Sequence, residues 1–452
     1  MDEFDHLLLH LSDIHFRIPN LGPAYDLDSD LRNRLIDDAG TMRSKLGSPS
    51  AILVSGDVAF SGKKDQYEEA ERWLDDELCV SVQGDPASVW CVPGNHDVDR
   101  SVKENRPSYN DARNALRQCD PHRIDSLLAE HLNEPHKFYD AIGPYNDFAL
   151  RHGCEISVGQ PVWNTGDAYQ LSDGSILRIF GLNSALISDE RDHVEHGKLV
   201  VGRYQCQLLQ NPRYVNVAMC HHPPDWLRDY EMMEETLNPR CSIQLFGHKH
   251  RYKLGKYNET LLRVSAGAVH PSRSETNWEP RYNWIGVRVQ TESGKRRLAV
   301  RVYPRVWNAD LQTFSPDLTK CSLGSDFVAY SLQLPEFTET AGAANPPRAN
   351  AEEPSEPGPP ALDDEGMRDG RGNPIVDAER ALARRYLQLG YVKRMQVAID
   401  LKLLQDNDDT LTDHEREVTH LSRAKERHLL GQLWEAVERA HADGRYPENP
   451  FN

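Results

Sequence analysis

The chain has 452 residues, a formal charge of −18 at pH 7 and a pI of about 5.5. This length suits two or three domains, and the negative charge argues against tight non-specific binding to nucleic acid. Eight scattered cysteines without a Cys-x-x-Cys pair argue against a disulfide framework or a zinc finger. The acidic start and the lack of a long apolar run argue against a secretory signal and a membrane span, so we expect a cytoplasmic protein.

Apolar strands alternate with helices in the first hundred residues. Strands are predicted at residues 6–12, 51–54 and 89–92, and apolar residues at helical spacing predict helices at 26–46 and 64–79. This order predicts parallel strand pairing and an α/β layer architecture.

A helical insertion and further strands follow. Residues 104–152 are mostly helical and polar, and we expect this insertion to cap a pocket. Residues 168–187 predict a hairpin around Asp173-Gly174. Further strands are predicted at 214–220, 242–246, 259–266, 284–290 and 297–304. We expect the last three to belong to the second half of a two-sheet core.

The composition changes after residue 335, which predicts three regions. We expect residues 1–335 to form the larger folded domain, and the Pro-rich, acidic segment 336–374 predicts a disordered linker. Residues 375–452 predict a small all-α module. Two amphipathic helices broken at Gly390 carry Leu382, Tyr386, Leu389, Val392, Met395, Ile399 and Leu403. A third helix starts at the capping box Thr412-x-x-Glu415 and carries Leu430, Leu433, Trp434 and Val437.

Five of the apolar strands end in loops with side chains that can bind metal ions. The candidate ligands are Asp13, His15, Asp57, Asn95, His221, His248 and His250. Three of them directly follow a glycine, which permits sharp turns and close approach. The mixture of imidazole, carboxylate and amide oxygen suits Mn, Fe, Zn or Co better than Ca or Mg. Seven ligands exceed the needs of one tetrahedral ion and suit two ions that share a bridging carboxylate.

The ordered motifs resemble those of the calcineurin-like metallophosphoesterase superfamily. They read Asp13-x-His15, Gly56-Asp57, Gly94-Asn95-His96-Asp97, His221 and Gly247-His248-x-His250. The resemblance covers residues 6–305. It implies an α/β fold, a two-sheet β-sandwich flanked by helices (αββα), with the site at the strand ends.

The resemblance also implies roles for individual residues. One metal would be held by Asp13, His15, Asp57 and His250, and the other by Asp57, Asn95, His221 and His248, with Asp57 bridging. Manganese is the favoured metal, with Fe, Zn or Co as alternatives. His96 would contact the phosphate and protonate or stabilise the leaving group, and Asp97 would orient His96. Candidate substrate contacts are Arg17, His222 and His270. A position behind the ligands or at the surface is an alternative for His222, and a structural role is an alternative for His270.

The implied activity is phosphodiester hydrolysis by a metal-bridging hydroxide, without a phosphoenzyme. Phe60 stands where purple acid phosphatases have Tyr, and Gly56-Asp57 is not followed by the Asp-Arg-Gly of Ser/Thr protein phosphatases. Asn95-His96-Asp97 and His221-His222-Pro223-Pro224 resemble instead the bacterial cyclic-nucleotide and glycerophosphodiester phosphodiesterases. We therefore expect a nucleotide-type phosphodiester as substrate.

Two alternatives remain open for the function. The first is a nuclease of the same superfamily that acts as an effector in bacterial defence. Arg17, Arg251, Arg273 and Arg281 lie near the motif loops in the sequence. A non-catalytic scaffold is the second, although it predicts lost ligands and all seven are present. The C-terminal helices loosely resemble adaptor domains of bacterial conflict systems, which implies a protein partner or self-association. A bundle that merely covers the core is the alternative.

Overall fold

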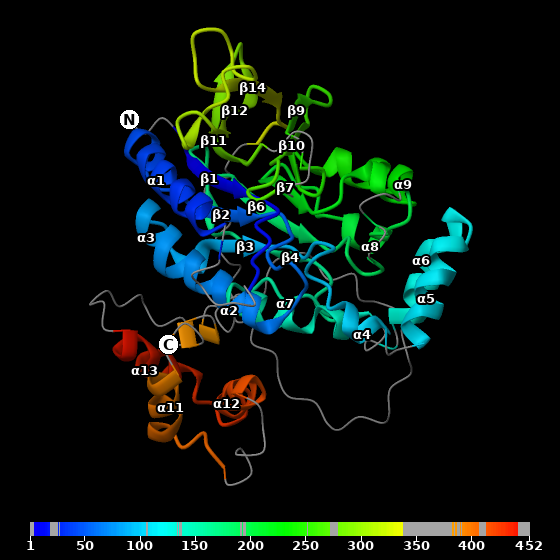
Figure 1. The fold of residues 1–452 in the computed structure, drawn as a ribbon, viewed down its shortest axis with the longest axis vertical. Helices are drawn as coiled ribbons and strands as arrows, with labels where there is room; N and C mark the ends of the chain where they lie inside the picture. The colour runs from blue at the N-terminus through cyan, green and yellow to red at the C-terminus, as the bar shows by residue number, and fades with distance from the viewer. Residues whose placement is uncertain are drawn as a thin grey trace, which may run out of the picture.

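The computed structural model describes residues 4–18, 26, 28–104, 107–132, 134, 138–189, 192, 196–250, 252–271, 279–337, 382–383, 385–386, 389, 391–405 and 413–441. Two seven-stranded sheets share one large apolar core, and helices flank them (Figure 1). This arrangement confirms the predicted two-sheet α/β architecture.

The first sheet has the strand order β13-β12-β11-β1-β2-β3, with β14 paired to β12. Its strands are β1 (His6–Leu11), β2 (Ala51–Val54), β3 (Val89–Cys91), β11 (Arg281–Glu292), β12 (Lys295–Asn308), β13 (Thr313–Pro316) and β14 (Val328–Gln333). β1, β2 and β3 pair in parallel, as predicted. β2 is buried along its whole length, which its unbroken apolar sequence requires.

The second sheet has the order β4-β6-β7-β8-β10-β9, with β5 paired to β6. Its strands are β4 (Trp163–Asn164), β5 (Tyr169–Gln170), β6 (Ile176–Leu182), β7 (Tyr214–Cys220), β8 (Ile243–Phe246), β9 (Lys253–Lys256) and β10 (Leu262–Ser265). β6, β7, β8 and β10 are parallel neighbours. The antiparallel pair of β5 and β6 confirms the predicted hairpin.

The assignment of the last strands to the second half of the core was only partly correct. β10 does join the second sheet, but β11 and β12 return to the first, where β11 pairs antiparallel with β1. The physical reason is the open edge of β1 on the side away from β2. β11 supplies the hydrogen-bonding partners that this buried edge needs.

Helices lie around the two sheets (Figure 1). They are α1 (Ser29–Leu46), α2 (Lys64–Arg72), a π-helical turn (Trp73–Leu78), α3 (Cys79–Val82), α4 (Arg100–Glu104), α5 (Pro107–Gln118), α6 (Ile124–Leu132), α7 (Gly143–Arg151), α8 (Arg203–Cys206) and α9 (Tyr230–Leu237). Asp38 of α1 accepts hydrogen bonds from Arg305 (2.8 Å) and from Tyr282 (2.5 Å), which fixes α1 to the first sheet.

The predicted helical insertion corresponds to α5, α6 and α7, with the end of α4. It packs against the loop that follows β6. Arg117 of α5 lies 2.6 Å from Asp189 and 3.0 Å from Asp192 of that loop. These buried ion pairs hold the insertion to the core, and its role as a cap stays a prediction.

The C-terminal helices form their own apolar cluster, in which Leu382, Tyr386, Leu433 and Trp434 are buried. The helices are α11 (Tyr391–Asp400), α12 (Asp413–Glu426) and α13 (Leu430–His441). The predicted single third helix is therefore two helices, separated where His428 has a φ of 55°. Ile399, predicted on the apolar stripe, is 52% exposed. Gly390, Thr412 and nearly all of the predicted linker lie outside the described residues.

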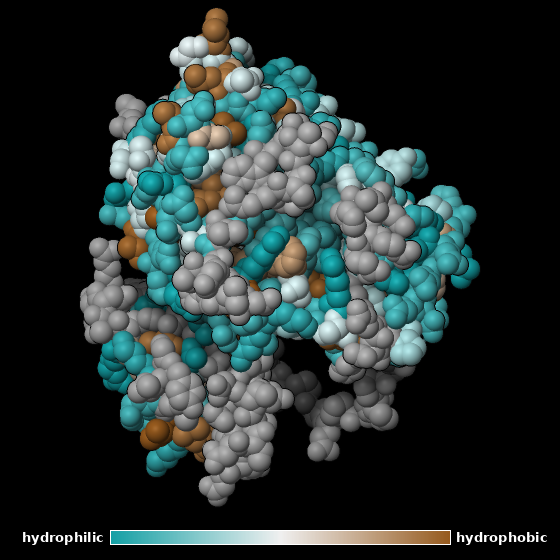
Figure 2. Space-filling model, in the orientation of Figure 1, coloured by the Kyte–Doolittle hydropathy of each residue, from teal (hydrophilic) through white to brown (hydrophobic). Residues whose placement is uncertain are grey.

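The visible surface is mainly hydrophilic, and apolar residues gather over the end formed by β12 and β14 (Figure 2). The exposed leucines of the chain between these strands are Leu311, Leu318 and Leu323. Among the described residues, we find no helix with the length and apolar character needed to span a bilayer.

Candidate metal centre

The site lies where the carboxyl ends of strands from both sheets meet. β1, β2 and β3 end there in the first sheet, and β7 and β8 end there in the second. Backbone hydrogen bonds hold the loops in place: His15 N donates to Asp57 O (3.0 Å), and Gly247 N donates to His221 O (3.0 Å). Since all five strands are parallel within their own sheets, the seven predicted ligands converge on one region.

One group of predicted ligands comes from β1 and β8. His250 Nε2 lies 3.2 Å from Asp13 Oδ1, and His15 Nε2 lies 3.2 Å from Asp57 Oδ2. Asp13, His15 and His250 offer ligand atoms that all lie within 4.8 Å of one another. This matches the grouping implied for the first metal.

A second group surrounds the side-chain oxygen of Asn95. His221 Nε2 lies 3.1 Å from Asn95 Oδ1, and His248 Nδ1 lies 2.9 Å from the same atom. His221 Nε2 also lies 3.3 Å from Asp57 Oδ2. One oxygen of Asp57 therefore faces both groups, as a bridging ligand would.

The hydrogen-bond partners of the His15 and His221 rings fit a bound cation. The Nδ1 atoms of His15 and His221 face the carbonyl oxygens of His270 (3.2 Å) and Ser55 (2.8 Å), which can only accept a hydrogen bond. In the neutral ring, Nε2 then carries a lone pair that points at the Asp57 carboxylate. A bound cation would remove this repulsion, as would a proton on His221, and histidine ligands usually donate their other N–H in this way.

The charge on Asp57 also favours a cation. Although burial opposes it, His221 and His96 hold the pKa of the Asp57 carboxyl well below its usual range. The Asp57 carboxylate in turn overcomes the effect of burial on His221 and raises its pKa to about 9. Since, despite burial, the hydrogen bond with His250 also holds the pKa of the Asp13 carboxyl below its usual range, two carboxylates accompany the protonated His221 ring and the centre keeps a net negative charge.

Five of the seven predicted ligands have a left-handed backbone. The φ angles are 54° at Asp13, 56° at His15, 55° at Asp57, 67° at His248 and 49° at His250. Such conformations cost about 1–3 kcal/mol each for residues other than glycine and cluster at functional sites. The strain aims these side chains inward at the strand ends.

Three glycines make room for the ligands, as the sequence predicts. A Cβ atom at Gly56 would overlap the His221 ring, and one at Gly94 would overlap the Asp57 carboxylate. At Gly247 the added atom would collide with Ser12 and lie 2.8 Å from the carbonyl oxygen of Ser55. These positions need glycine for close packing.

His96 is half-buried beside the first group of ligands. Its ring lies 4.6 Å from that of His15, and its Nδ1 lies 2.7 Å from the carbonyl oxygen of Phe60. The carbonyl holds the proton on Nδ1, which leaves Nε2 for a substrate. Burial lowers the pKa of His96 to about 4, although the Asp57 carboxylate acts in the opposite direction.

Asp97 does not orient His96, contrary to the expectation from the sequence. Its carboxylate accepts hydrogen bonds from the backbone N–H of Gly94 (2.9 Å) and Ala59 (2.8 Å) and from the hydroxyl of Tyr67 (2.9 Å). It therefore ties the loop after β3 to the loop after β2. The sequence carries no signal for the part played by Tyr67, because its position on α2 reads as an ordinary core residue.

Arg17 lies at the mouth of the site. Its guanidinium is 3.7 Å from the centre of the Phe60 ring, which in turn lies 5.2 Å from the His96 ring. Arg17 is exposed. This position suits contact with a substrate phosphate.

The other two predicted substrate contacts are buried. His222 is fully buried, so the surface alternative was wrong: its Nε2 lies 3.2 Å from Asn95 Oδ1 and its Nδ1 lies 2.8 Å from Ser184 Oγ. His270 Nε2 lies 2.6 Å from Asp28, while its backbone oxygen faces His15. The surroundings of His270 favour the structural alternative. The sequence had not pointed to Ser184.

The calcineurin-like phosphoesterase model matches residues 6–252, which is more than half of the 452 residues. The chain belongs to the calcineurin-like phosphoesterase family. A second model, the GTPase-associated adaptor domain, matches residues 378–439. No match was found among the curated proteins compared with the chain.

Several solved structures resemble this calcineurin-like phosphoesterase. A dimetal phosphatase from Danio rerio is 14% identical with a TM-score of 0.36, covering 66% of this chain and 96% of that one. A calcineurin-like phosphoesterase from Bacillus subtilis is 11% identical with a TM-score of 0.31, covering 74% and 93%. A 5′-nucleotidase from Candida albicans is 10% identical with a TM-score of 0.33, covering 70% of this chain and 52% of that one.

Family membership supports a phosphoric ester hydrolase with a dimetal centre, and it rests on the sequence match. The grouped His and Asp side chains are candidate ligands for that centre.

Replacing Gly94 by Ala should remove metal binding, because the new methyl group overlaps the Asp57 carboxylate. We expect the metal content, measured by mass spectrometry after reconstitution with Mn²⁺, to fall from about two ions per chain to below one. Gly143→Ala is the matched control, since no atom lies within 4 Å of its added Cβ. A Gly94→Ala chain that retains two ions would contradict the bridging position of Asp57.

Replacing Asp97 by Asn should destabilise the protein by about 3 kcal/mol, because an amide cannot accept hydrogen bonds from all the donors that the carboxylate now satisfies. Tyr67→Phe removes only one of these donors and should cost about 1 kcal/mol. Urea unfolding measures both effects. Equal losses for the two variants would argue against the role of Asp97 in tying the loops together.

Proposed function

We propose that the chain is a two-metal phosphodiesterase that hydrolyses a nucleotide-type phosphodiester. The observation that carries the proposal is the position of Asp57 Oδ2, 3.2 Å from His15 and 3.3 Å from His221. A single carboxylate oxygen shared by two groups of ligands is the arrangement that a pair of metal ions requires.

The ligand assignment follows the two groups. Asp13, His15, Asp57 and His250 would hold one ion, and Asp57, Asn95, His221 and His248 would hold the other, with Mn²⁺ as the favoured metal. Two bound ions supply activation of a water molecule and neutralise charge on the phosphoryl oxygens. His222 and Ser184 support this set through Asn95.

His96 would donate a proton to the leaving group. In the hydrolysis, the water oxygen bonds to phosphorus, the ester P–O bond breaks, and the departing oxygen takes a proton. The Phe60 carbonyl aims the His96 ring, so that Nε2 is available to give this proton. A bound phosphate adds negative charge next to His96, which favours the protonated ring. Arg17 would bind a phosphoryl oxygen from the mouth of the site.

The surroundings favour small nucleotide substrates over long nucleic acids. Arg281, one of the arginines considered for a nuclease, is buried and lies 2.5 Å from Asp317 and 2.8 Å from Glu279. It is therefore unavailable to a phosphate backbone. Arg251 and Arg273 lie outside the described residues. The charge of −18 also opposes non-specific binding to nucleic acid.

We also propose a cytoplasmic location and a protein partner. All eight cysteines are free, which suits a reducing compartment. The C-terminal helices match the GTPase-associated adaptor domain and bury their apolar side chains mainly among themselves. This supports an interaction module at residues 375–452, with a GTPase-containing assembly as the partner class and self-association as the alternative.

A metal-dependent activity screen tests the proposed reaction. We expect hydrolysis of bis-p-nitrophenyl phosphate with Mn²⁺, none after chelation with EDTA, and weaker hydrolysis of the monoester. Asp57→Ala should abolish turnover, and His96→Ala should lower kcat by about 100- to 10,000-fold, the range for loss of a general acid. His122→Ala, at an exposed histidine of the insertion, is the control.

The same screen includes cyclic nucleotides and single- and double-stranded DNA. Metal-dependent turnover of DNA above that of nucleotides would favour the nuclease. The absence of metal-dependent hydrolysis for every substrate would refute the enzymatic function.

A chain that ends at residue 337 tests the C-terminal module. Because the two apolar clusters are largely separate, we expect the truncated chain to hydrolyse bis-p-nitrophenyl phosphate within about twofold of the full chain. Sedimentation velocity should show that any self-association of the full chain is lost. Loss of turnover on truncation would instead favour a bundle that covers the core.

A further inference from the structure

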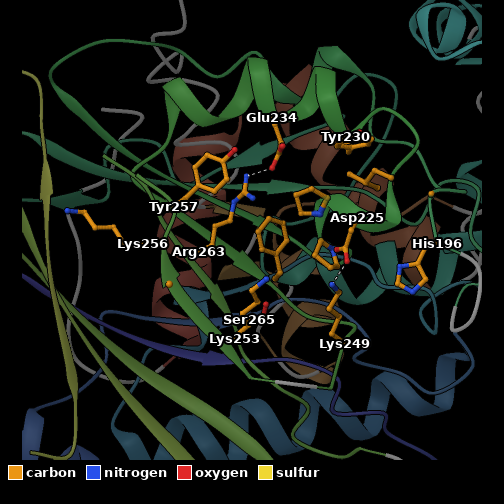
Figure 3. Close-up of a pocket in the computed structure, with 16 residues that line it drawn as sticks. His196, Asp225, Tyr230, Glu234, Lys249, Lys253, Lys256, Tyr257, Arg263 and Ser265 are labelled. Carbon is orange, nitrogen blue, oxygen red and sulfur yellow. Dashed lines mark hydrogen bonds and ion pairs between the residues drawn. The ribbon is translucent and has the colours of Figure 1, made fainter. Parts of the chain in front are cut away.

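A cavity of about 700 Å³ opens beside the metal centre, and Figure 3 shows the residues that line it. Pro223 in its wall directly follows His222, and Lys249 stands between His248 and His250. The Trp226 ring, next to the wall, lies 4.7 Å from the His248 ring. The cavity and the metal centre therefore share loops, and the volume is typical of a site for a small organic ligand.

The floor of the cavity is the outer face of the second sheet. Ser265 of β10 pairs with Phe246 of β8 on one side and with Lys253 of β9 on the other. Alternate residues of a strand point to the same face, so Arg263 and Ser265 both line the cavity. Phe246, at the end of β8, lies two residues before His248. The floor of the cavity is therefore continuous with the loop that carries His248 and His250.

The cavity is locally cationic on an acidic protein. Its lining includes Lys249, Lys253, Lys256 and Arg263 but only two carboxylates, those of Asp225 and Glu234. Arg263 is paired with Glu234 (2.8 Å), Lys256 with Glu259 (2.7 Å), and Lys249 with Asp225. Within the described ranges, Lys253 makes no ion pair. Its ammonium group is therefore available to an anionic ligand.

Two exposed tyrosine rings also line the cavity. Tyr257 is 50% exposed and Tyr230 is 43% exposed, although both are large aromatic residues. The Arg263 guanidinium lies 4.0 Å from the centre of the Tyr257 ring. Flat aromatic and guanidinium surfaces favour stacking with a planar ring.

Gly255 leaves space over the floor. It lies opposite Arg263 in the strand pairing, and a Cβ atom placed on it would meet no atom within 4 Å. The cavity therefore has open space at Gly255, near Tyr257, and the ammonium group of Lys253 lies on the same strand as Gly255. A planar ring that carries an anionic group matches both features.

We propose that this cavity binds the leaving nucleotide of the phosphodiester substrate, with its base near Tyr257 and its own phosphate at Lys253. The inference rests on the proposed phosphodiesterase activity of the neighbouring metal centre. It names the substrate class as a dinucleotide with a second, terminal phosphate, so that the departing group is itself a nucleotide. The Lys249 loop joins the cavity to the site of cleavage.

Calorimetric titration of the full chain, loaded with Mn²⁺, tests the cavity directly. The probes are adenosine 5′-monophosphate, ribose 5-phosphate and a dinucleotide that carries a terminal phosphate and a non-hydrolysable methylenephosphonate link. We expect adenosine 5′-monophosphate to bind about tenfold more tightly than ribose 5-phosphate, because only the former carries a base. Phosphate contacts at the metal centre are common to both probes and cancel in this comparison.

Two variants locate the binding. Gly255→Leu should remove the advantage of adenosine 5′-monophosphate over ribose 5-phosphate, because the side chain fills the space over the floor. Lys253→Ala should weaken dinucleotide binding about tenfold through the lost charge. Lys295→Ala, at an exposed lysine on the first sheet, is the matched control and should change neither value. Thermal unfolding of each variant checks that it is folded.

The outcomes separate this inference from the proposed function. Equal binding of adenosine 5′-monophosphate and ribose 5-phosphate, or binding that neither variant alters, would overturn the assignment of the cavity. A dinucleotide that binds no better than the mononucleotide would overturn its role for the leaving group. Hydrolysis of bis-p-nitrophenyl phosphate by the unaltered chain reports on the metal centre alone, so its failure counts against the proposed reaction and not against the titrations.

Discussion

The carboxylate of Asp57 is the group on which the rest of the site depends. Its Oδ2 faces His15 from the first sheet and His221 from the second, while its Oδ1 accepts a hydrogen bond from the backbone N–H of His96 (2.7 Å). A buried carboxylate needs such partners, because charge without compensation is costly in the interior. Asp57 therefore contacts predicted metal ligands from both sheets and also the predicted proton donor.

The geometry around Asp57 is strained and supported from outside. The left-handed backbone at Asp13, His15 and Asp57 is unfavourable, yet each of these residues makes a backbone hydrogen bond to a neighbouring loop. His270 N donates to Asp13 O, for example, at 3.0 Å. A neutral ring nitrogen of His221 would repel the Asp57 carboxylate that it faces, which is a cost that a proton or a cation relieves. Both costs are consistent with a fold whose site is completed by cations.

The sequence predicted the parts of the site that depend on local patterns. Polar residues after apolar runs gave the candidate ligands, and the glycines before Asp57, Asn95 and His248 marked close packing, as the overlaps at these glycines show. It did not predict contacts that depend on the tertiary fold. Asp97 looked like a partner of His96 because the two are adjacent, but its acceptors are used by loops and by Tyr67. Likewise, the strand pattern of β11 could not tell which sheet it joins.

The convergence of the ligands also governs when the site can form. Asp13, Asp57 and Asn95 belong to the early part of the chain, whereas His248 and His250 follow much later, beyond the insertion and most of the second sheet. Such long-range contacts form late, because a large loop must close before they are made. A ribosome-bound or partly folded chain therefore holds an incomplete set of ligands. Metal capture would then mark the docking of the two sheets, and the ion would stabilise only the chain that has finished folding.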